Sequence, residues 1–433
     1  MAIIKAVRAR EILDSRGNPT IETSVWSGDI GATATIPSGA SVGDKEALEL
    51  RDKDPSRFQG KGVLKAVQLV NQTISKYLIG QDPTKQNAID QMLINLDGTK
   101  NKSKLGANTI LSVSQAVFEL GARISSMQTY QYVQAKYGLH QPTAASLPTP
   151  MFNIINGGKH GDGNLDFQEY HVIPSSKLDF KQSLRIGDEI YHKLKQLLIS
   201  KNANYSVGDE GGFTPNLNQN VDAISLIMEA IQATPYQLNQ EVFMGLDIAA
   251  SEFFKSGQYK IKDRKESYSP EDFVKYLLDL KSKFGHILLE DPLDQDSWAD
   301  WKALTGFIGS DTLIVGDDLL VTHPALLKKA IDEKACNAVI IKPNQVGTIS
   351  EAASVIKMAK ANNISCIVSH RSGDTNEDFL ADFAVGVGAD YVKFGAPVRG
   401  ERTSKYNRLS LIQEYLTLGA SPSPNATKAP ARP

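Results

Sequence analysis

The sequence predicts an α/β protein in which a closed (β/α)8 barrel of the TIM type follows a smaller N-terminal α+β domain. The first observation is a set of short apolar runs that each end in an ionisable residue, namely Asp247, Glu290, Asp317, Lys342, His370 and Lys393. The second is their spacing of 23 to 43 residues, which leaves room for a loop, a helix and the next strand. Ionisable residues at the ends of consecutive parallel strands are typical of a barrel mouth. An open doubly wound sheet also binds ligands at strand ends, but it has no reason to place a chemical group on every strand.

The run that best defines this pattern is residues 338–341, which leads into Lys342 and stops at Pro343. An unbroken apolar run rich in β-branched residues is typical of a strand buried on both faces. A single lysine at the end of a strand is usually solvated, and a lysine is rarely buried unless it is paired or has a chemical task. The repetition of the pattern on other strands favours a chemical task for Lys342.

Residues 1–140 are predicted to form the smaller domain. Alternating apolar and polar residues predict strands at 3–12 and 20–26, and a third short strand is expected at 31–36. Apolar residues at three- and four-residue spacing predict helices at about 63–78, 85–95, 107–122 and 128–137. Three prolines between residues 138 and 150 indicate the domain boundary.

Residues 141–418 are predicted to form the barrel. Strands at 151–156 and 167–173 flank a glycine-rich loop, and a helix is expected at 179–200. Helices and strands alternate from about residue 221 to Lys393, and a last helix covers about 408–418. The tail, residues 419–433, has four prolines in its last thirteen residues and is predicted to be disordered.

Composition excludes several classes of protein. The net charge is −2, from 47 basic and 49 acidic residues, and no basic block suggests a nucleic-acid surface. No apolar run is long enough to span a membrane, and the N-terminus does not resemble a signal peptide, so a cytoplasmic location is expected. The two cysteines, Cys336 and Cys366, form no metal or disulfide pattern and are expected to be buried thiols.

Three of the strand-end residues are carboxylates: Asp247, Glu290 and Asp317. Carboxylates that converge raise the pKa of one another unless a cation neutralises them. Because no cysteine or histidine belongs to this set, the ligands favour Mg²⁺ or Mn²⁺ over zinc. Helix capping or salt bridging would explain any one of them alone. Glu290 and Asp317 are each followed by a second acid, and the sequence does not decide which member of each pair faces inward.

Two lysines, Lys342 and Lys393, are expected beside these carboxylates. A lysine near a divalent ion and a second lysine has a lowered pKa, so it can act as a general base near neutral pH. Glu210, between glycines, and Glu169 are candidate acids, since glycine lets the backbone approach a ligand closely. Taken singly, each of these two acids would more often be solvated.

Residues 370–373 combine His370 with a guanidinium, a hydroxyl and a glycine, which suits an anionic phosphate. Arg371 and Ser372 are therefore candidate phosphate ligands, although a helix cap with a salt bridge would explain the same pattern. His160 lies in the glycine-rich loop, which would suit a cover over a substrate.

With these residues in this order, the chain resembles the enolase family over nearly its whole length, to about residue 418. The matching stretches are residues 11–20 (EILDSRGNPT), 38–41 (SGAS), 156–158 (NGG), 208–212 (GDEGG), 341–348 (IKPNQVGT), 369–373 (SHRSG) and 395–397 (GAP). The resemblance implies a modified barrel that begins ββαα behind an α+β domain. It also implies reversible dehydration of 2-phospho-D-glycerate to phosphoenolpyruvate in glycolysis and gluconeogenesis, with two Mg²⁺ per active site.

The resemblance further implies roles for the candidate residues. Asp247, Glu290 and Asp317 would hold the first Mg²⁺, which selects the first acid of each tandem pair, and Ser41 would help to hold the second. Lys342 would remove the C2 proton to give a metal-stabilised ene-diolate. Glu210 would protonate the leaving hydroxyl with help from Glu169.

The remaining roles implied by the resemblance concern substrate binding. Lys393 would neutralise the carboxylate of the substrate, Arg371 and Ser372 with His370 would bind its phosphate, and His160 would close over the site. The family assembles as homodimers, or in some bacteria as octamers. By the same resemblance alone, a fraction of the protein could lie at the cell surface or be secreted.

Three positions differ from the usual family pattern: Val42, Gly161 and Phe394. A phenylalanine after Lys393 either points outward or reshapes the substrate pocket. Two alternatives therefore stay open, namely an enolase-like paralogue acting on a related phospho- or phosphono-acid, and a non-catalytic scaffold or surface-binding role. The sequence does not give the oligomeric state or a role for the tail.

Overall fold

The computed structural model describes residues 2–39, 45–138, 141–161, 165–285 and 287–419. Its N-terminal part contains an antiparallel sheet of order β1-β2-β3, with β1 (Ala6–Leu13), β2 (Pro19–Ser27) and β3 (Ile30–Thr35). All three predicted strands are confirmed to within a few residues. One face of β2 buries Ile21 and Val25 against the helices, as alternation of apolar and polar residues requires.

The predicted helices of this part are also present. They are α1 (Leu64–Gln68), α2 (Ser75–Leu78), α3 (Gln86–Asp97), α4 (Ala107–Ile124) and α5 (Thr129–Tyr137). The prediction of one helix at 63–78 is corrected in detail, since a π-helical stretch, Leu69–Ile74, joins α1 to α2. Helix α4 packs against β2 and β3 on one side and α11 of the barrel on another, which explains why nearly all of it is buried.

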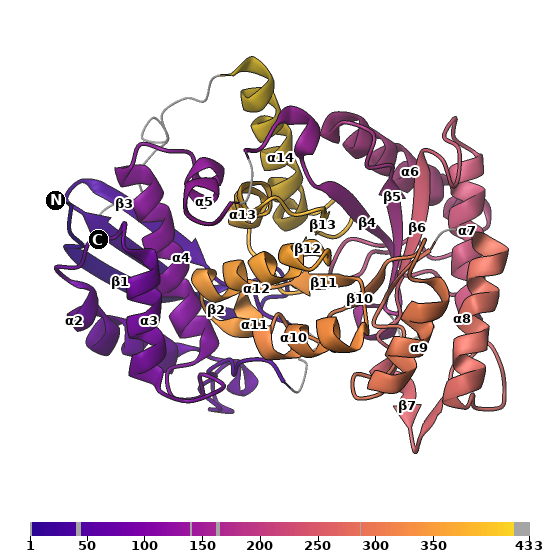
Figure 1. Cartoon of the computed structure of the whole chain (residues 1–433), viewed down its shortest axis with the longest axis horizontal. Helices are drawn as coiled ribbons and strands as arrows, with labels where there is room; N and C mark the ends of the chain where they lie inside the picture. The colour runs from indigo at the N-terminus through magenta and orange to yellow at the C-terminus, as the bar shows by residue number, and fades with distance from the viewer. Residues whose placement is uncertain (1, 40–44, 139–140, 162–164, 286, 420–433) are drawn as a thin grey trace.

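The rest of the chain forms a closed eight-stranded barrel of order β10-β11-β12-β13-β4-β5-β6-β9 (Figure 1). Its strands are β4 (Thr149–Asn156), β5 (Glu169–Pro174), β6 (Val242–Asp247), β9 (Ile287–Glu290), β10 (Ile314–Gly316), β11 (Ala338–Ile341), β12 (Ser365–Ser369) and β13 (Tyr391–Lys393). β5 runs antiparallel to both β4 and β6, whereas the other neighbouring pairs are parallel. The modified barrel beginning ββαα is therefore confirmed. A separate two-stranded sheet joins β7 (Phe254–Lys255) to β8 (Gln258–Tyr259).

Helices surround this barrel (Figure 1). They are α6 (Phe180–Ser200), α7 (Asn220–Gln232), α8 (Pro270–Phe284), α9 (Trp298–Ile308), α10 (Pro324–Glu333), α11 (Pro343–Val346), α12 (Ile349–Ala361), α13 (Phe379–Val387) and α14 (Gly400–Leu418). The last helix begins eight residues before the predicted start at 408. Its first turns carry Glu401, Arg402 and Lys405, which are buried, so their charges hid the helix from an argument based on apolar spacing.

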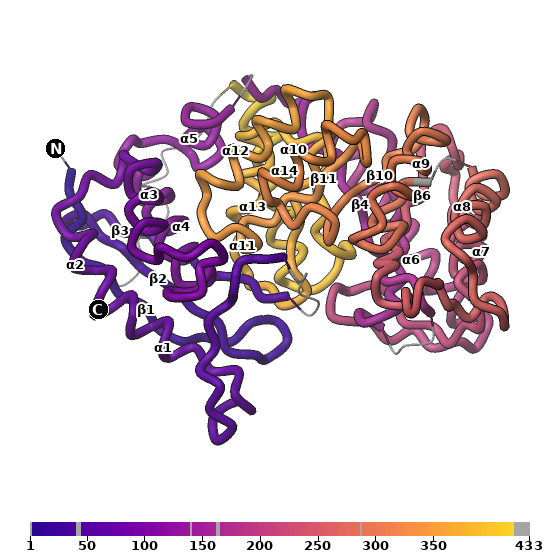
Figure 2. The backbone as a smooth tube through the Cα atoms, turned by 60° about the horizontal axis from the view of Figure 1, so that its bottom comes forward, coloured from indigo at the N-terminus to yellow at the C-terminus, as the bar shows by residue number. Residues whose placement is uncertain are grey.

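The two parts of the chain lie side by side, with the N-terminal region against the segment from α11 to α14 (Figure 2). Helix α5 packs on α13, and the backbones of Ser38 and Gly373 pair. Residue 140, where the predicted first domain ends, lies outside the described residues, and so does the predicted disordered tail except for Gly419. Among the described helices, none combines the length and apolar character that crossing a membrane requires.

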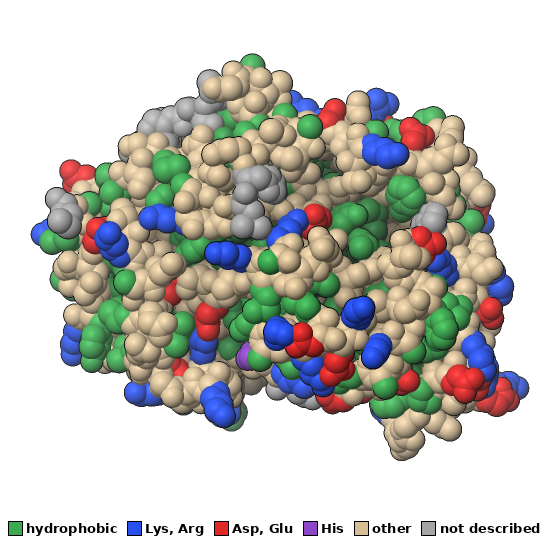
Figure 3. Space-filling view, viewed as in Figure 1, with side chains coloured by type: hydrophobic (Ala, Val, Ile, Leu, Met, Phe, Trp, Pro, Cys, Tyr) green, Lys and Arg blue, Asp and Glu red, His purple; other side chains and the backbone are tan. Residues whose placement is uncertain are grey.

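The end of the barrel where the parallel strands begin is apolar. A hollow of about 350 Å³ opens there, lined mainly by Ile173, Pro174, Phe243, Leu288, Leu313 and Tyr391. Figure 3 shows hydrophobic side chains gathered in this hollow. Both cysteines are buried thiols, as predicted. The chemistry-bearing side chains lie at the opposite end, where the parallel strands finish.

Candidate active site

The barrel mouth, defined here as the end where the parallel strands finish, places most of the predicted residues together. Asp247 ends β6 and pairs in register with Glu290, which ends β9. Glu169 begins the reversed strand β5 and pairs with Asp247. Because β5 runs the other way, its first residue reaches the same mouth as the last residues of its neighbours.

Lys393, at the end of β13, occupies the middle of these carboxylates. Its Nζ lies 2.8 Å from both Glu290 oxygens, 2.9 Å from Asp247 Oδ2 and 3.3 Å from Glu169 Oε1. Burial would lower the pKa of Lys393, but the surrounding carboxylates raise it well above its usual value. Lys393 is therefore held as a cation. Burial and Asp247 still leave the pKa of Glu290 well above its normal range, so negative charge is in excess here.

Lys342 has a different environment. It follows β11, and its Nζ contacts Asp317, which follows β10. Gln345 Nε2 donates to the other oxygen of Asp317 at 3.0 Å. Burial lowers the pKa of Lys342, but the Asp317 carboxylate outweighs this and raises it. The prediction of a lowered pKa assumed a divalent ion beside Lys342. Among the protein groups alone, the contact with Asp317 acts in the opposite direction.

A neutral network holds Lys342 and Gln345 in place. Thr322 Oγ1 donates to Gln345 Oε1 at 2.6 Å and accepts from the Lys342 backbone N–H at 2.9 Å. Thr322 and Val321 have positive φ angles of 53° and 41°, a conformation that β-branched residues rarely adopt. Backbone strain of this kind persists where surrounding contacts over-determine the conformation, and it clusters at functional sites.

In each pair of consecutive acids, Glu290–Asp291 and Asp317–Asp318, one member contacts a lysine of the mouth. Glu290 contacts Lys393 and Asp317 contacts Lys342, so the first member of each pair faces a lysine of the mouth. Asp291 instead accepts the backbone N–H groups of Asp317 and Asp318, at 3.0 and 2.7 Å. Asp291 thus fixes the loop that carries Asp317.

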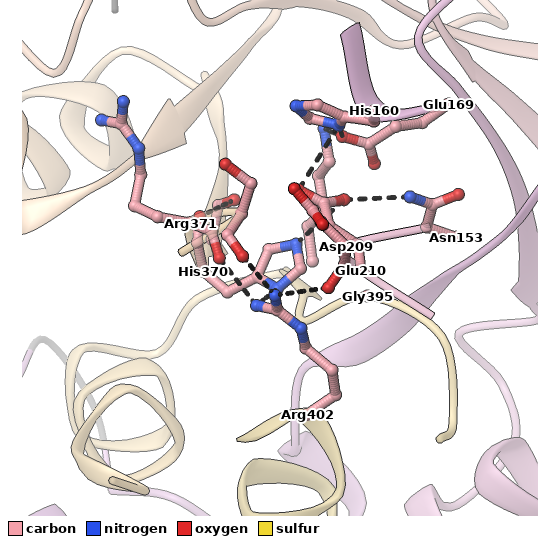
Figure 4. A network of polar contacts seen from close by, with 12 residues as sticks. Asn153, His160, Glu169, Asp209, Glu210, His370, Arg371, Gly395 and Arg402 are labelled. Atoms are coloured by element: carbon pink, nitrogen blue, oxygen red, sulfur yellow. Dashed lines mark hydrogen bonds and ion pairs between the residues drawn. The ribbon is translucent and has the colours of Figure 1, made fainter. Parts of the chain in front are cut away.

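A second group of acids and imidazoles includes His160, Glu210 and His370 (Figure 4). His160 Nδ1 lies 3.2 Å from Glu169 Oε1 and 3.4 Å from Glu210 Oε1. Asn153 Nδ2 donates to Glu210 Oε2 at 2.9 Å, and His370 Nε2 lies 3.5 Å from the same oxygen. Burial and Glu169 raise the pKa of Glu210, but the His160 and His370 contacts lower it to about 2. Glu210 is therefore a carboxylate in the substrate-free protein.

The predicted phosphate ligands lie on the side of the mouth nearest the N-terminal region. Arg371 pairs with Glu46 at 2.9 Å, and both side chains are almost fully buried. Ser372 is also buried. A phosphate that binds Arg371 would therefore compete with Glu46. Ser41, the predicted ligand of a second Mg²⁺, and Val42 lie outside the described residues.

The other two unusual positions have clear structural settings. Phe394 is completely buried and packs against Tyr406 of α14, with ring centroids 5.9 Å apart. Of the two orientations considered from the sequence, the ring therefore takes the outward one, between the barrel and the helix. At Gly161 a Cβ would lie 2.6 Å from the backbone oxygen of Asn156, so the loop packs too closely here for alanine without a shift.

The sequence argument missed several residues of the mouth, namely Glu46, Asn153, Thr322, Gln345 and Arg402. Gln345 lies in the family-like stretch 341–348, and Asn153 lies in the predicted strand 151–156. Each is an amide in a segment that leads to ionisable candidate residues, and this could have marked both as candidate site residues. Glu46 and Arg402 follow no strand and belong to no pattern around the barrel. Only the folded chain brings them to the mouth.

The ligand atoms that the three predicted metal-binding residues offer are of the kind that a divalent cation binds. Asp247, Glu290 and Asp317 supply carboxylate oxygens alone, the ligands that Mg²⁺ prefers, and the raised pKa values of Asp247 and Glu290 mean that added positive charge would stabilise their ionised forms. Among the described side chains, two triads bring ligand atoms within 4.8 Å of one another, His160–Glu169–Glu210 and Asp291–Asp317–Asp318. The predicted trio is not one of them, and its members contact Lys393 or Lys342.

A closed barrel with acids and amines gathered where its strands finish places this chain among the barrel enzymes. Comparison with known families then identifies it. Residues 4–133 match the model described as "Enolase, N-terminal domain", and residues 144–428 match "Enolase, C-terminal TIM barrel domain". Together the two matches span most of the chain, so it belongs to the enolase family.

Proposed function

We propose that this protein is a glycolytic lyase that reversibly dehydrates 2-phospho-D-glycerate to phosphoenolpyruvate. Its two enolase domains support a lyase of the enolase superfamily. The observation that carries the specific proposal is the unequal pairing of two lysines at one mouth. Lys393 contacts three carboxylates, whereas Lys342 has an ion pair with Asp317 alone among the residues that the structure describes. A lysine with one anionic partner is the one more easily deprotonated, which favours Lys342 as the base.

Proton transfer follows from these roles. In the dehydration direction the Lys342 amine takes the C2 proton, and the electron pair forms the C2–C3 double bond. The C3 hydroxyl leaves as water with a proton from Glu210. In the hydration direction the Lys342 ammonium donates to C2 and the Glu210 carboxylate takes a proton from water. The raised pKa of Lys342 and the lowered pKa of Glu210 favour an ammonium group and a carboxylate, which are the forms that hydration requires. Dehydration therefore starts from an enzyme form in which Lys342 is a neutral amine and Glu210 is a protonated acid.

Asp247, Glu290 and Asp317 would hold one Mg²⁺, and Ser41 would contribute to a second. Bound there, Mg²⁺ supplies positive charge that makes the C2 proton more acidic. A cation that shares Asp317 also weakens the pull of this carboxylate on the Lys342 proton. Arg371, Ser372 and His370 would bind the phosphate, Lys393 the carboxylate, and His160 and Glu169 would line the side where the hydroxyl leaves.

The test is to add the purified protein and Mg²⁺ to 2-phosphoglycerate and to follow the ultraviolet absorbance of the enol product. Wild-type protein should produce it, EDTA should stop the reaction, and Lys342→Ala should reduce kcat by about 10³-fold or more. Lys357→Ala is the matched control, because Lys357 is exposed on α12 outside the mouth. No absorbance change with wild-type protein would contradict the proposal and favour a paralogue or a binding role.

Cytoplasmic location and assembly as a dimer or octamer belong to the same proposal, and light scattering would test the assembly.

A further inference from the structure

Arg402, on the first turn of α14, is completely buried beneath the mouth (Figure 4). Its Nη1 lies 2.7 Å from His370 Nδ1 and also donates to the Arg371 carbonyl at 2.7 Å. Its Nη2 donates to the carbonyls of Ser372 and Asp209, at 2.6 and 3.1 Å. One guanidinium thus ties the segment that carries His370 to the segment that carries Glu210.

The contact with His370 has a chemical consequence. A guanidinium has donors and no acceptor, so His370 Nδ1 must accept the hydrogen bond. Burial and Arg402 lower the pKa of His370 to about 4, which keeps the imidazole neutral near pH 7. A neutral imidazole carries one proton, and with Nδ1 as acceptor that proton is on Nε2. Nε2 is the atom that lies 3.5 Å from Glu210 Oε2.

The two oxygens of Glu210 therefore have different surroundings. Oε2 faces two N–H groups, Asn153 Nδ2 at 2.9 Å and His370 Nε2. The Asn153 amide must present its nitrogen here, because its oxygen would repel a carboxylate. Oε1 faces His160 Nδ1, which it shares with Glu169. An oxygen that accepts the Asn153 hydrogen bond and has a second N–H group 3.5 Å away is the poorer place for a proton.

We propose that Arg402 is a positioning residue that fixes His370 as the Nε2–H tautomer, so that Oε2 of Glu210 stays an acceptor and Oε1 is the atom that carries and releases its proton. The last step rests on the proposed function: the Oε1–H bond breaks, its proton joins the leaving hydroxyl as water, and the Glu210 carboxylate remains. The tautomer itself does not depend on which substrate binds.

The first test is nitrogen NMR of the full chain labelled with ¹⁵N-histidine, with the His370 signals assigned by their loss in His370→Gln. The wild-type protein should show Nε2 protonated and Nδ1 unprotonated from pH 6 to 9 without substrate. A protonated Nδ1 would overturn the proposal. Arg402→Lys should give a mixture of tautomers, whereas the control Arg399→Lys should not, because Arg399 contacts Glu401 and not His370. An unchanged tautomer in folded Arg402→Lys would also overturn it.

The second test is kinetic and remains available if Arg402→Lys does not fold. Asn153→Leu removes one donor from Oε2 at similar size, so kcat for dehydration should fall by about 100-fold while KM changes less than about threefold. An unchanged kcat would overturn the assignment of Oε1. Absence of dehydration by the wild-type protein would instead contradict the proposed function, and the NMR result would still decide the tautomer.

Discussion

The barrel mouth and the seam between the two domains bury carboxylates in opposite ways. At the mouth, Glu169, Asp247 and Glu290 all contact the ammonium group of Lys393, and Asp317 contacts that of Lys342. At the seam, defined here by Thr35, Glu119, Glu377 and Asp378, two glutamate side chains hydrogen-bond to each other. Glu377 also accepts from the backbone N–H and the hydroxyl of Thr35, at 2.7 and 2.9 Å.

The two arrangements differ in how they respond to pH. Burial and the neighbouring Glu377 raise the pKa of Glu119 well above its usual value, and burial raises the pKa of Glu377 to about 7. Arg123 opposes this only in part. The seam is therefore stabilised by a shared proton that is lost near neutral pH. At the mouth the ammonium groups of Lys393 and Lys342 keep their charge throughout the neutral range, although the pKa values of Asp247 and Glu290 are still raised. Pairing with ammonium groups suits a catalytic site that needs ionised side chains at pH 7. A shared proton is sufficient for a contact whose role is structural.

Removing the cation at the centre of the mouth should have the largest effect. Lys393→Met leaves Glu169, Asp247 and Glu290 buried together without compensation, and should lower the free energy of unfolding by about 3–5 kcal/mol at pH 7 in EDTA. The mouth would then behave like the seam, because protonation would relieve the repulsion. Urea unfolding should therefore show a smaller loss at pH 5 than at pH 8. A loss independent of pH would contradict this view of the mouth.

Changing the acid pair should have the next largest effect. A carboxyl whose pKa is raised by folding stabilises fully below its unfolded pKa near 4.5, and this contribution is lost as pH rises through about 7. Glu119→Gln keeps a hydrogen bond to Glu377 and removes one titration, so at pH 8.5 the variant should be more stable than wild type by about 2 kcal/mol. At pH 5 the two should be nearly equal. Urea midpoints at both values measure this, with the exposed Glu266→Gln as control; an equal gain at both pH values would count against proton sharing.

The smallest effect is expected from the neutral part of the mouth. Thr322→Val removes the hydroxyl that links Gln345 to the Lys342 backbone and keeps the branched shape, and should cost about 1–2 kcal/mol without pH dependence. Thr322→Ser keeps the hydroxyl and should cost less than about 1 kcal/mol. Thermal unfolding of both variants at two pH values makes the comparison. A pH-dependent loss would mean that Thr322 acts through the charge on Asp317.

The fold was predictable because its signals are local. Apolar runs and their spacing located the barrel strands, and the residues after those runs, such as Asp247 and Lys393, meet at the mouth because parallel strands finish at one end. The residues that were not predicted reach the mouth through contacts between segments that are far apart in the sequence. Arg402 stands nine residues past Lys393 and before the predicted start of the last helix at 408, and Glu46 reaches Arg371 across 325 residues. The contact of Lys342 with Asp317, which raises the pKa of the lysine when only protein groups are considered, is of the same kind.

The reversed strand β5 has a topological consequence for the chain. In a regular barrel the link that enters each strand arrives at the end far from the catalytic groups, as the link from α9 to β10 does here. Because β5 points backwards, the link from β4 starts at Asn156 and finishes at Glu169, both on the catalytic side. New chain ends introduced between α9 and β10 would open onto the distal surface, whereas ends introduced between Asn156 and Glu169 would separate His160 from one of its two anchors. Circular permutation and tag insertion should therefore be directed to the distal links and kept out of this hairpin.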